Sequence, residues 1–335
     1  MAQVVQQYVT HAFKKCEVIA LMSTRGKRDW ASPLLWLAAL MRLTQLRFSR
    51  RKTVAVFHIS QGGSMVREGT LAWFAKEILG LHTIMHIHGS QFVDFGNKHT
   101  RLARFALSHA DRVLTLTSET SDAAKLLVPP ETPVSMVRNA VSNARYQVPK
   151  ENIILFAGEV GYRKGIDTLL TAWTMLQDST RNWELLVAGP IKLDEDTLCV
   201  KGVQILGPLN GDTVKKLEAR ASIAVLPSRD EALPMFLIEA MAHGCAVIGT
   251  DVGQVAELLD GAGILIEPDS PEQLARALLG LMEDDRERAA LGKSALEKFQ
   301  RNYSMTTIAD DLVAEWLSAE RNGAAPQEKV PGEIG

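Results

Sequence analysis

Short apolar runs rich in Val, Ile and Leu recur along the whole chain and alternate with longer segments of helical character. This alternation predicts β-α-β units whose strands are buried in parallel sheets. In the first half, strands are expected at residues 17–22, 53–58, 82–88, 112–117 and 134–137. After a linker at 141–151 the pattern restarts, and strands are expected at 153–156, 183–188, 203–206, 223–226, 246–250 and 263–266. The chain is therefore expected to be an α/β protein.

Two such sheets predict two doubly wound, Rossmann-like domains that face each other across a cleft at the ends of their strands. The length of 335 residues accommodates two domains of about 150 residues each. The expected boundaries are 1–148 and 149–302, followed by a helix at 303–321 that crosses back to the first domain. Residues 322–335 read as a flexible tail.

The β-α-β unit at 223–250 carries the most chemical information. Its helix is expected to begin at Pro234, which suits the first turn, so the N–H groups of Met235 and Phe236 are free to bind an anion such as a diphosphate. Glu231 precedes this helix and Glu239 lies one turn inside it. Two such acids alone are more often a loop acid and a solvated helix acid. Around a diphosphate, Glu239 suits the diol of a ribose and Glu231 suits a sugar beyond the phosphates.

This unit resembles the donor-sugar motif of family 4 glycosyltransferases, which are retaining enzymes of the GT-B fold. In that motif a loop Glu and a helix Glu flank Gly-Phe-Pro, and here Glu231 and Glu239 flank Ala-Leu-Pro. The resemblance implies that the two domains adopt the GT-B fold and that the second domain binds a nucleotide-diphosphate sugar.

A second segment, 154–173, is similar to the family's strand, loop and helix that carry Gly-Arg and then Lys-Gly. Lys164 and Gly165 match Lys-Gly, whereas Glu159 stands where the family has an arginine that neutralises the diphosphate. A glutamate beside a diphosphate would be costly, so Glu159 is expected to point away. Arg163 is either the replacement for the missing cation or a solvated loop residue.

A third segment, 83–92, resembles the family's strand that ends with a histidine lining the cleft, where it meets the donor sugar and the acceptor. His88 has this position, and Gly89 after it would permit close approach of a ligand. His86, two residues earlier on the same strand face, reads as a structural histidine. Together the three segments extend the resemblance over about residues 50–320.

The resemblance implies the retaining transfer of a hexose from a nucleotide-diphosphate sugar to an acceptor hydroxyl, without a metal or other cofactor. Gly189 and Gly207, at strand ends of the second domain, would flank the base or are simply turns. Asp194 begins an acidic triplet in an expected loop, and no metal site is assigned to it. The catalytic candidates are His88 and Glu231, and the donor-binding candidates are Lys164, Arg163, Glu239, Met235, Phe236, Gly189 and Gly207.

The start of the chain departs from the family, in which a first strand and a Gly-rich loop precede the first helix. Here the chain is expected to begin inside that helix, so that the first domain is truncated at its start, or residues 17–22 replace the missing strand. This departure and Glu159 favour one rival, a non-catalytic GT-B-like binding protein or inactive transferase. A nucleotide-sugar epimerase is a second rival.

Charge divides the chain, since residues 1–150 contain 20 basic and 9 acidic residues and residues 151–335 contain 17 basic and 30 acidic residues. In the basic half, the segment 30–52 joins Leu and Trp residues to a cationic end. It reads either as a helix on an anionic membrane surface or as an ordinary core-facing helix. A lipid-linked or polysaccharide acceptor fits the first reading. Nucleic-acid binding is not expected, because these basic residues accompany apolar ones rather than a stacking platform.

The three cysteines, Cys16, Cys199 and Cys245, lie far apart and lack the spacing of a disulfide framework or a zinc site. The first residues contain no apolar core of the signal-peptide type, and no apolar stretch reaches the length of a membrane span. A cytoplasmic location is therefore expected, either free or peripheral on the inner face of the membrane.

Overall fold

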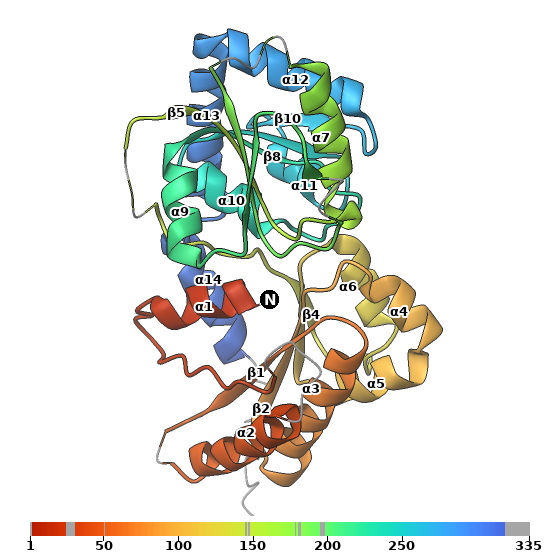
Figure 1. Cartoon of the computed structure of the whole chain (residues 1–335). Coiled ribbons are helices and arrows are strands. Elements are labelled where there is room, and N and C mark those ends of the chain that lie inside the picture. Colours follow the sequence, from red (N-terminus) through yellow and green to blue (C-terminus); the bar gives the residue numbers. More distant parts are fainter. Residues whose placement is uncertain are drawn as a thin grey trace, which may run out of the picture. The chain divides into compact units, whose positions relative to one another are not determined.

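The computed structural model describes residues 2–24, 31–49, 51–144, 146, 148–177, 179, 182–194 and 198–318. These residues divide into two compact units (Figure 1). The C-terminal unit comprises residues 138–309 together with 2–12, and the N-terminal unit comprises residues 13–137 together with 310–318. The expected tail at 322–335 lies outside the described residues.

The C-terminal unit is built on a parallel sheet with the strand order β10-β9-β8-β5-β6-β7. The order runs outward from β5 to β7 and resumes with β8 on the other side of β5, so this sheet is doubly wound. Ligands of such sheets bind at the carboxyl ends of the strands where the order reverses, which here is between β5 and β8. The strands are β5 Glu151–Ala157, β6 Glu184–Ala188, β7 Val203–Gly207, β8 Ala221–Leu226, β9 Ala246–Thr250 and β10 Ile264–Ile266.

Helices cover both faces of this sheet, which explains why every residue of β8 is buried and all but Ser222 are apolar. Helices α9, α10 and α13 pack on one face, and α7 packs with α12 on the other (Figure 1). Residues 271–302 form two helices rather than one, because Asp284 ends α12 and its side chain caps the first N–H groups of α13. The helices of the unit are α1 Ala2–Thr10, η2 Tyr162–Lys164, α7 Ile166–Met175, α9 Gly211–Arg220, α10 Met235–Ala242, α11 Val255–Leu259, α12 Pro271–Glu283 and α13 Asp285–Asn302.

The first helix, α1, belongs to the C-terminal unit although it begins the chain. Val4 and Tyr8 are each 1% exposed, and the Gln7 side chain accepts hydrogen bonds from the backbone N–H and the hydroxyl of Ser142. The boundaries expected from the sequence, 1–148 and 149–302, place all of the first 148 residues in the first domain. The contacts of α1 instead join two stretches that are far apart in the sequence.

The N-terminal unit has a parallel sheet whose strands follow the chain in the order β1-β2-β3-β4. The strand order does not reverse among the described strands of this unit, whereas it does in the doubly wound sheet of the C-terminal unit. The strand expected at 17–22 is wrong, because these residues form no strand and Ile19 and Met22 are 42% and 63% exposed. A short apolar run does not identify a strand by itself. The strands are β1 Val54–Ile59, β2 His82–Ile87, β3 Arg112–Thr115 and β4 Val134–Met136.

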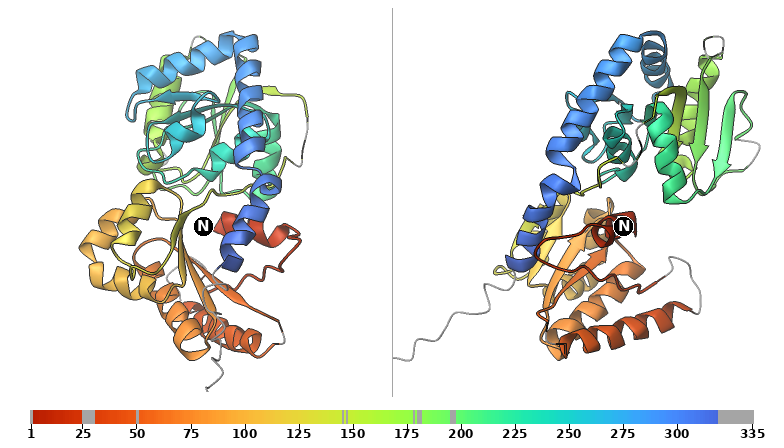
Figure 2. Two further views of the ribbon diagram at one scale, coloured as in Figure 1. Left: turned by 180° about the vertical axis from the view of Figure 1, so that it is seen from behind. Right: turned by 90° about the vertical axis from the view of Figure 1, so that its left-hand side faces the viewer.

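One face of this sheet carries the hydrophobic core of the unit. Helices α2 and α3 contribute to that core on the same side (Figure 2). Helix α2 buries Ala39 and Leu43 there and leaves Leu34, Leu37 and Met41 about half exposed or more. No helix among the described residues has the length and apolar character needed to cross a bilayer. The helices are α2 Ala31–Arg47, α3 Gly63–Trp73, η1 Phe74–Ile78, α4 Phe92–Lys98, α5 Thr100–Ser108, α6 Ser118–Lys125 and α14 Met305–Ser318, which begins in the C-terminal unit.

Candidate functional site

The loops after β5 and β8 meet at the reversal point of the C-terminal sheet. Lys164, from the first loop, forms an ion pair with the carboxylate of Glu231, from the second. Ser228 donates a further hydrogen bond to the same carboxylate at 2.9 Å. The side chains of Lys164 and Glu231 are only 15% and 9% exposed. Two residues chosen from the sequence, 67 positions apart, therefore share one partly buried site.

Gly165 allows the two loops to come this close. Its backbone is left-handed, with φ of 69°, and a Cβ atom added there would lie 1.8 Å from the carbonyl oxygen of Pro227. Both the conformation and the space therefore require glycine. In the Lys-Gly pair, the glycine sets the backbone and the lysine supplies the charge.

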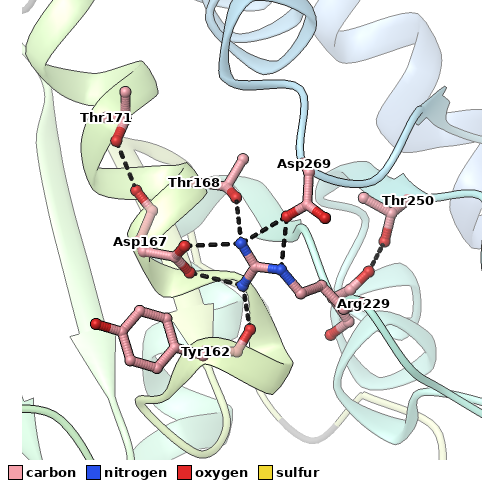
Figure 3. A network of polar contacts seen from close by, with 8 residues as sticks. Tyr162, Asp167, Thr168, Thr171, Arg229, Thr250 and Asp269 are labelled. Carbon is pink, nitrogen blue, oxygen red and sulfur yellow. Dashed lines mark hydrogen bonds and ion pairs between the residues drawn. The ribbon is translucent and has the colours of Figure 1, made fainter.

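Arg229 ties the loop after β8 to the start of α7 (Figure 3). Its guanidinium donates to both carboxylate oxygens of Asp167, at 2.8 and 2.7 Å, to Asp269 at 2.5 Å, and to the carbonyl oxygen of Tyr162. These ion pairs raise the pKa of Arg229 further above its usual value. A bidentate arginine holds geometry as well as charge. Sequence reasoning missed Arg229, because its partner Asp167 lies 62 positions away in the sequence.

Arg229 is expected to act as a positioning residue for Lys164 and Glu231. Replacing Arg229 by Met is expected to weaken binding of a nucleotide sugar about tenfold, because the two loops lose their fork of hydrogen bonds. Arg220→Met is the matched control, since Arg220 makes an equally bidentate pair with Glu151 at 2.7 and 2.8 Å, but at the amino end of β5. Calorimetry that finds equal affinities for the two variants would contradict the assignment.

Helix α10 begins directly after this loop pair. Pro234 is extended and provides no side-chain cap, so the first-turn N–H groups of Met235 and Phe236 remain available to an external acceptor. Arg163 is exposed on the neighbouring loop, where its guanidinium donates to the carbonyl oxygen of Asp230 at 3.2 Å. Glu231 therefore lies between its ion-pair partner Lys164 and the start of α10, which follows Glu231 in the same loop.

The remaining loop residues have identifiable backbone roles. Gly189 has φ of 143°, and a Cβ atom there would lie 1.6 Å from the carbonyl oxygen of Gly158, so it packs the loops after β5 and β6 together. Gly207 is left-handed at 66°, with open space around it. The Glu159 carboxylate lies beside Gly161, 3.6 Å from the position of an added Cβ. The expected contacts of Gly189 and Gly207 with a base stay predictions.

Glu239 is not the solvated helix acid that two Glu residues alone would favour. Its side chain is buried at 6% exposure and accepts a long hydrogen bond of 3.5 Å from Gln7. It borders a cavity of about 370 Å³ that is also lined by Ser142, Lys215 and His243. Burial raises the pKa of Glu239 to about 7, although Lys215 and Gln7 act in the opposite direction.

This raised pKa predicts a pH dependence of stability. The folded protein takes up a proton on Glu239 between pH 4.5 and about 7, where the unfolded chain does not, so the free energy of unfolding falls as pH rises through this range. Glu239→Gln is expected to remove on the order of 2–3 kcal/mol of that fall. The buried Glu218 carboxyl, whose pKa burial and Glu239 also raise, remains in the variant. Urea unfolding from pH 5 to 8 measures the difference, with the exposed Glu257→Gln as control; parallel curves for Glu239→Gln and the wild type would contradict it.

His88 lies in the N-terminal unit at the end of β2, where its N–H donates to the carbonyl oxygen of Ile59 at 2.8 Å. Its ring contacts two other histidines, His58 and His86, and burial lowers the pKa of all three. At Gly89 an added Cβ atom would lie 2.4 Å from the Gln61 side chain, and the expected close approach of a ligand stays a prediction. Sequence reasoning missed His58, which lies 30 positions before His88.

Comparison with known proteins agrees with this geometry. Residues 140–298, which contain the whole loop and helix arrangement around Lys164 and Glu231, match the family described as glycosyl transferases group 1. The match covers just under half of the chain. A relative, an uncharacterized glycosyltransferase of Methanocaldococcus jannaschii, is 32% identical over 49% of this chain and 44% of its own length. The alpha-D-kanosaminyltransferase of Streptomyces kanamyceticus is 26% identical over 84% of this chain and 81% of its own length.

Comparison with solved structures shows that the chain has the GT-B fold. Sucrose-phosphate synthase from Thermosynechococcus elongatus superposes with a TM-score of 0.71 at 18% identity, over 92% of this chain and 84% of that chain. Anabaena HepE in complex with UDP-glucose superposes with a TM-score of 0.65 at 16% identity, over 84% and 82% of the two chains. At these identities the likeness shows the fold alone, and the α/β, GT-B expectation is confirmed.

Proposed function

We propose that the chain transfers a hexose from a nucleotide-diphosphate sugar to an acceptor hydroxyl, with retention of configuration and without a metal ion in the transfer step. The observation that carries the proposal is the Lys164–Glu231 ion pair at the reversal point of the sheet, where the loop of Glu231 leads directly into α10. A cation and aligned N–H groups are what a departing diphosphate requires.

Each residue then has a defined task. Lys164 and the N–H groups of Met235 and Phe236 stabilise the diphosphate as the bond to the sugar breaks, and Arg163 adds a second cation from the exposed side of the loop. Glu231 accepts hydrogen bonds from sugar hydroxyls. In the N-terminal unit, His88 contacts the donor sugar on the acceptor side.

Glu239 accepts hydrogen bonds from the ribose hydroxyls in this proposal. With a pKa of about 7, it is partly protonated at neutral pH and becomes a full acceptor as pH rises. Its cavity, bordered by Ser142 and Lys215, offers polar groups beside that carboxylate. Gly189 and Gly207 would leave the strand ends free for the base.

The acceptor is proposed to be a lipid-linked or polysaccharide glycan, reached at the inner face of a membrane. Helix α2 supports this, because Leu34, Leu37 and Met41 are 55%, 48% and 62% exposed on a helix that ends with Arg47. Arg51 and Lys52 follow and are also exposed. Flotation with anionic liposomes tests the surface: binding that is undiminished in an Arg51→Ala, Lys52→Ala variant would remove the electrostatic part of the proposal.

The decisive experiment is turnover with a panel of UDP-, GDP- and ADP-sugars, with the anomeric configuration of the product determined by NMR. Transfer with retention is expected with one member of the panel. HepE, a structural neighbour, was solved with UDP-glucose, which places UDP-glucose first in the panel. Donor binding without transfer to any acceptor would favour the non-catalytic alternative, which Glu159 in place of an arginine supports.

A further inference from the structure

Three histidines of the N-terminal unit gather on one face of its sheet. His58 on β1 is the register partner of His86 on β2, and His88 follows His86 by two positions. Residues i and i+2 of a strand point to the same face, and neighbouring strands lie about 4.8 Å apart. The sheet itself therefore directs the three imidazoles toward one another.

The three rings are close enough to bind one ion together. One nitrogen from each ring lies within 4.8 Å of the other two, and His58 Nδ1 is 2.8 Å from His88 Nε2. The ring centres of His86 and His88 are 4.0 Å apart. Nitrogen ligands of one tetrahedral zinc ion, each about 2.0–2.1 Å from the metal, lie roughly 3.3–3.4 Å from one another. The observed spacing brackets this value, so small rotations of the side chains reach it.

His86 provides an independent observation. Its side chain is fully buried, and neither of its ring nitrogens has a hydrogen-bond partner among the described residues. A buried polar atom without a hydrogen-bond partner lowers stability, and a bound water molecule or ion can supply that partner. His58 and His88 are partly exposed, whereas His86 is fully buried.

We propose that His58, His86 and His88 form a binding site for a transition-metal ion of the zinc class. Imidazole is a preferred ligand of Zn²⁺, Ni²⁺ and Cu²⁺, whereas Mg²⁺ and Ca²⁺ take oxygen ligands. Three nitrogen ligands leave a fourth position for water. The inference goes beyond the proposed transfer reaction and shares only His88 with it, and these residues would bind the ion in the absence of a nucleotide sugar.

Zinc binding by the full chain tests the proposal, measured by calorimetry after chelator treatment and without any nucleotide sugar. One zinc ion per chain is expected, and Co²⁺ in its place is expected to give the visible absorption of a four-coordinate ion. His86→Leu is expected to weaken zinc binding by about 100-fold or more. Its melting temperature should not fall, because leucine removes two buried nitrogens that lack partners.

His82→Gln is the matched control, because His82 lies on the same strand but faces Asp111 at 3.8 Å; it should keep the wild-type affinity. Zinc should also raise the melting temperature of the wild type and of His82→Gln, but not of His86→Leu. His58→Gln tests the cluster at a partly exposed position. The proposal is overturned if the wild type takes up no zinc, or if His86→Leu and His58→Gln both bind it as tightly as the wild type.

Discussion

Replacement of Lys164 by Met is expected to lower kcat/KM for sugar transfer by about 100- to 1000-fold. A preorganised charge aimed at a departing anion in a partly buried site contributes on this scale. Lys164 is 15% exposed and is held by Glu231, from the loop that leads into α10, so it cannot be replaced by a flexible surface cation. The measurement is steady-state kinetics with the donor identified by the sugar panel.

The loss has a competing cause that a second variant separates. In Lys164→Met, the nearly buried carboxylate of Glu231 loses its ion-pair partner and keeps the hydrogen bond from Ser228. A buried charge without an ion-pair partner can disturb a site by itself. The double variant Lys164→Met, Glu231→Gln removes that charge. Its rate is compared with that of Glu231→Gln alone, because Glu231 itself contacts the sugar in the proposal; if these two variants are equally active, the role of Lys164 at the diphosphate is rejected. Lys293→Met, at a 79% exposed side chain of α13, is the surface control and should leave the rate unchanged.

Gly165→Ala is expected to lower the free energy of unfolding by about 3 kcal/mol or more. The added Cβ atom would lie 1.8 Å from the Pro227 carbonyl oxygen, a backbone atom that cannot move without shifting the loop after β8. The left-handed backbone of Gly165 adds a further penalty for any residue with a side chain. Denaturant unfolding measures the change.

Gly207→Ala separates the two contributions to this effect. Gly207 is equally left-handed, with φ of 66°, but nothing lies within 4 Å of the added Cβ atom. Its replacement should therefore cost only the conformational penalty, about 1 kcal/mol. Equal destabilisation of the two variants would show that the close approach of Gly165 to Pro227 is not what holds the loops together.

The strands that carry the site could be predicted because a buried parallel strand appears in the sequence as a short run of mostly apolar residues. The strand β8 is apolar at nearly every position and is followed by Pro227, and the whole of it is buried between helices. Residues 17–22 have a similar composition but no neighbouring strand to pair with among the described residues, and they form none. An apolar composition predicts a buried strand only where the segment can pair with a neighbouring strand.

Contacts between segments that are distant in the sequence were harder to predict. Arg229 and Asp167 are 62 positions apart, and nothing in the spacing of the two residues announces their bidentate pair. The buried state of Glu239, with its raised pKa, depends on Gln7 and Lys215 from other elements. A side chain's protonation depends on its dielectric surroundings and neighbours, which only the folded chain defines.

The sequence by itself determined the α/β class, the strands of the C-terminal unit and, through a family resemblance, the choice of Lys164 and Glu231, because local periodicity, turn residues and short motifs are properties of short segments. Tertiary structure decided that these two residues touch, that Arg229 clamps their loops, and that His58 joins His86 and His88. The reason is physical: strand register and loop packing set distances between residues that chain order leaves undefined.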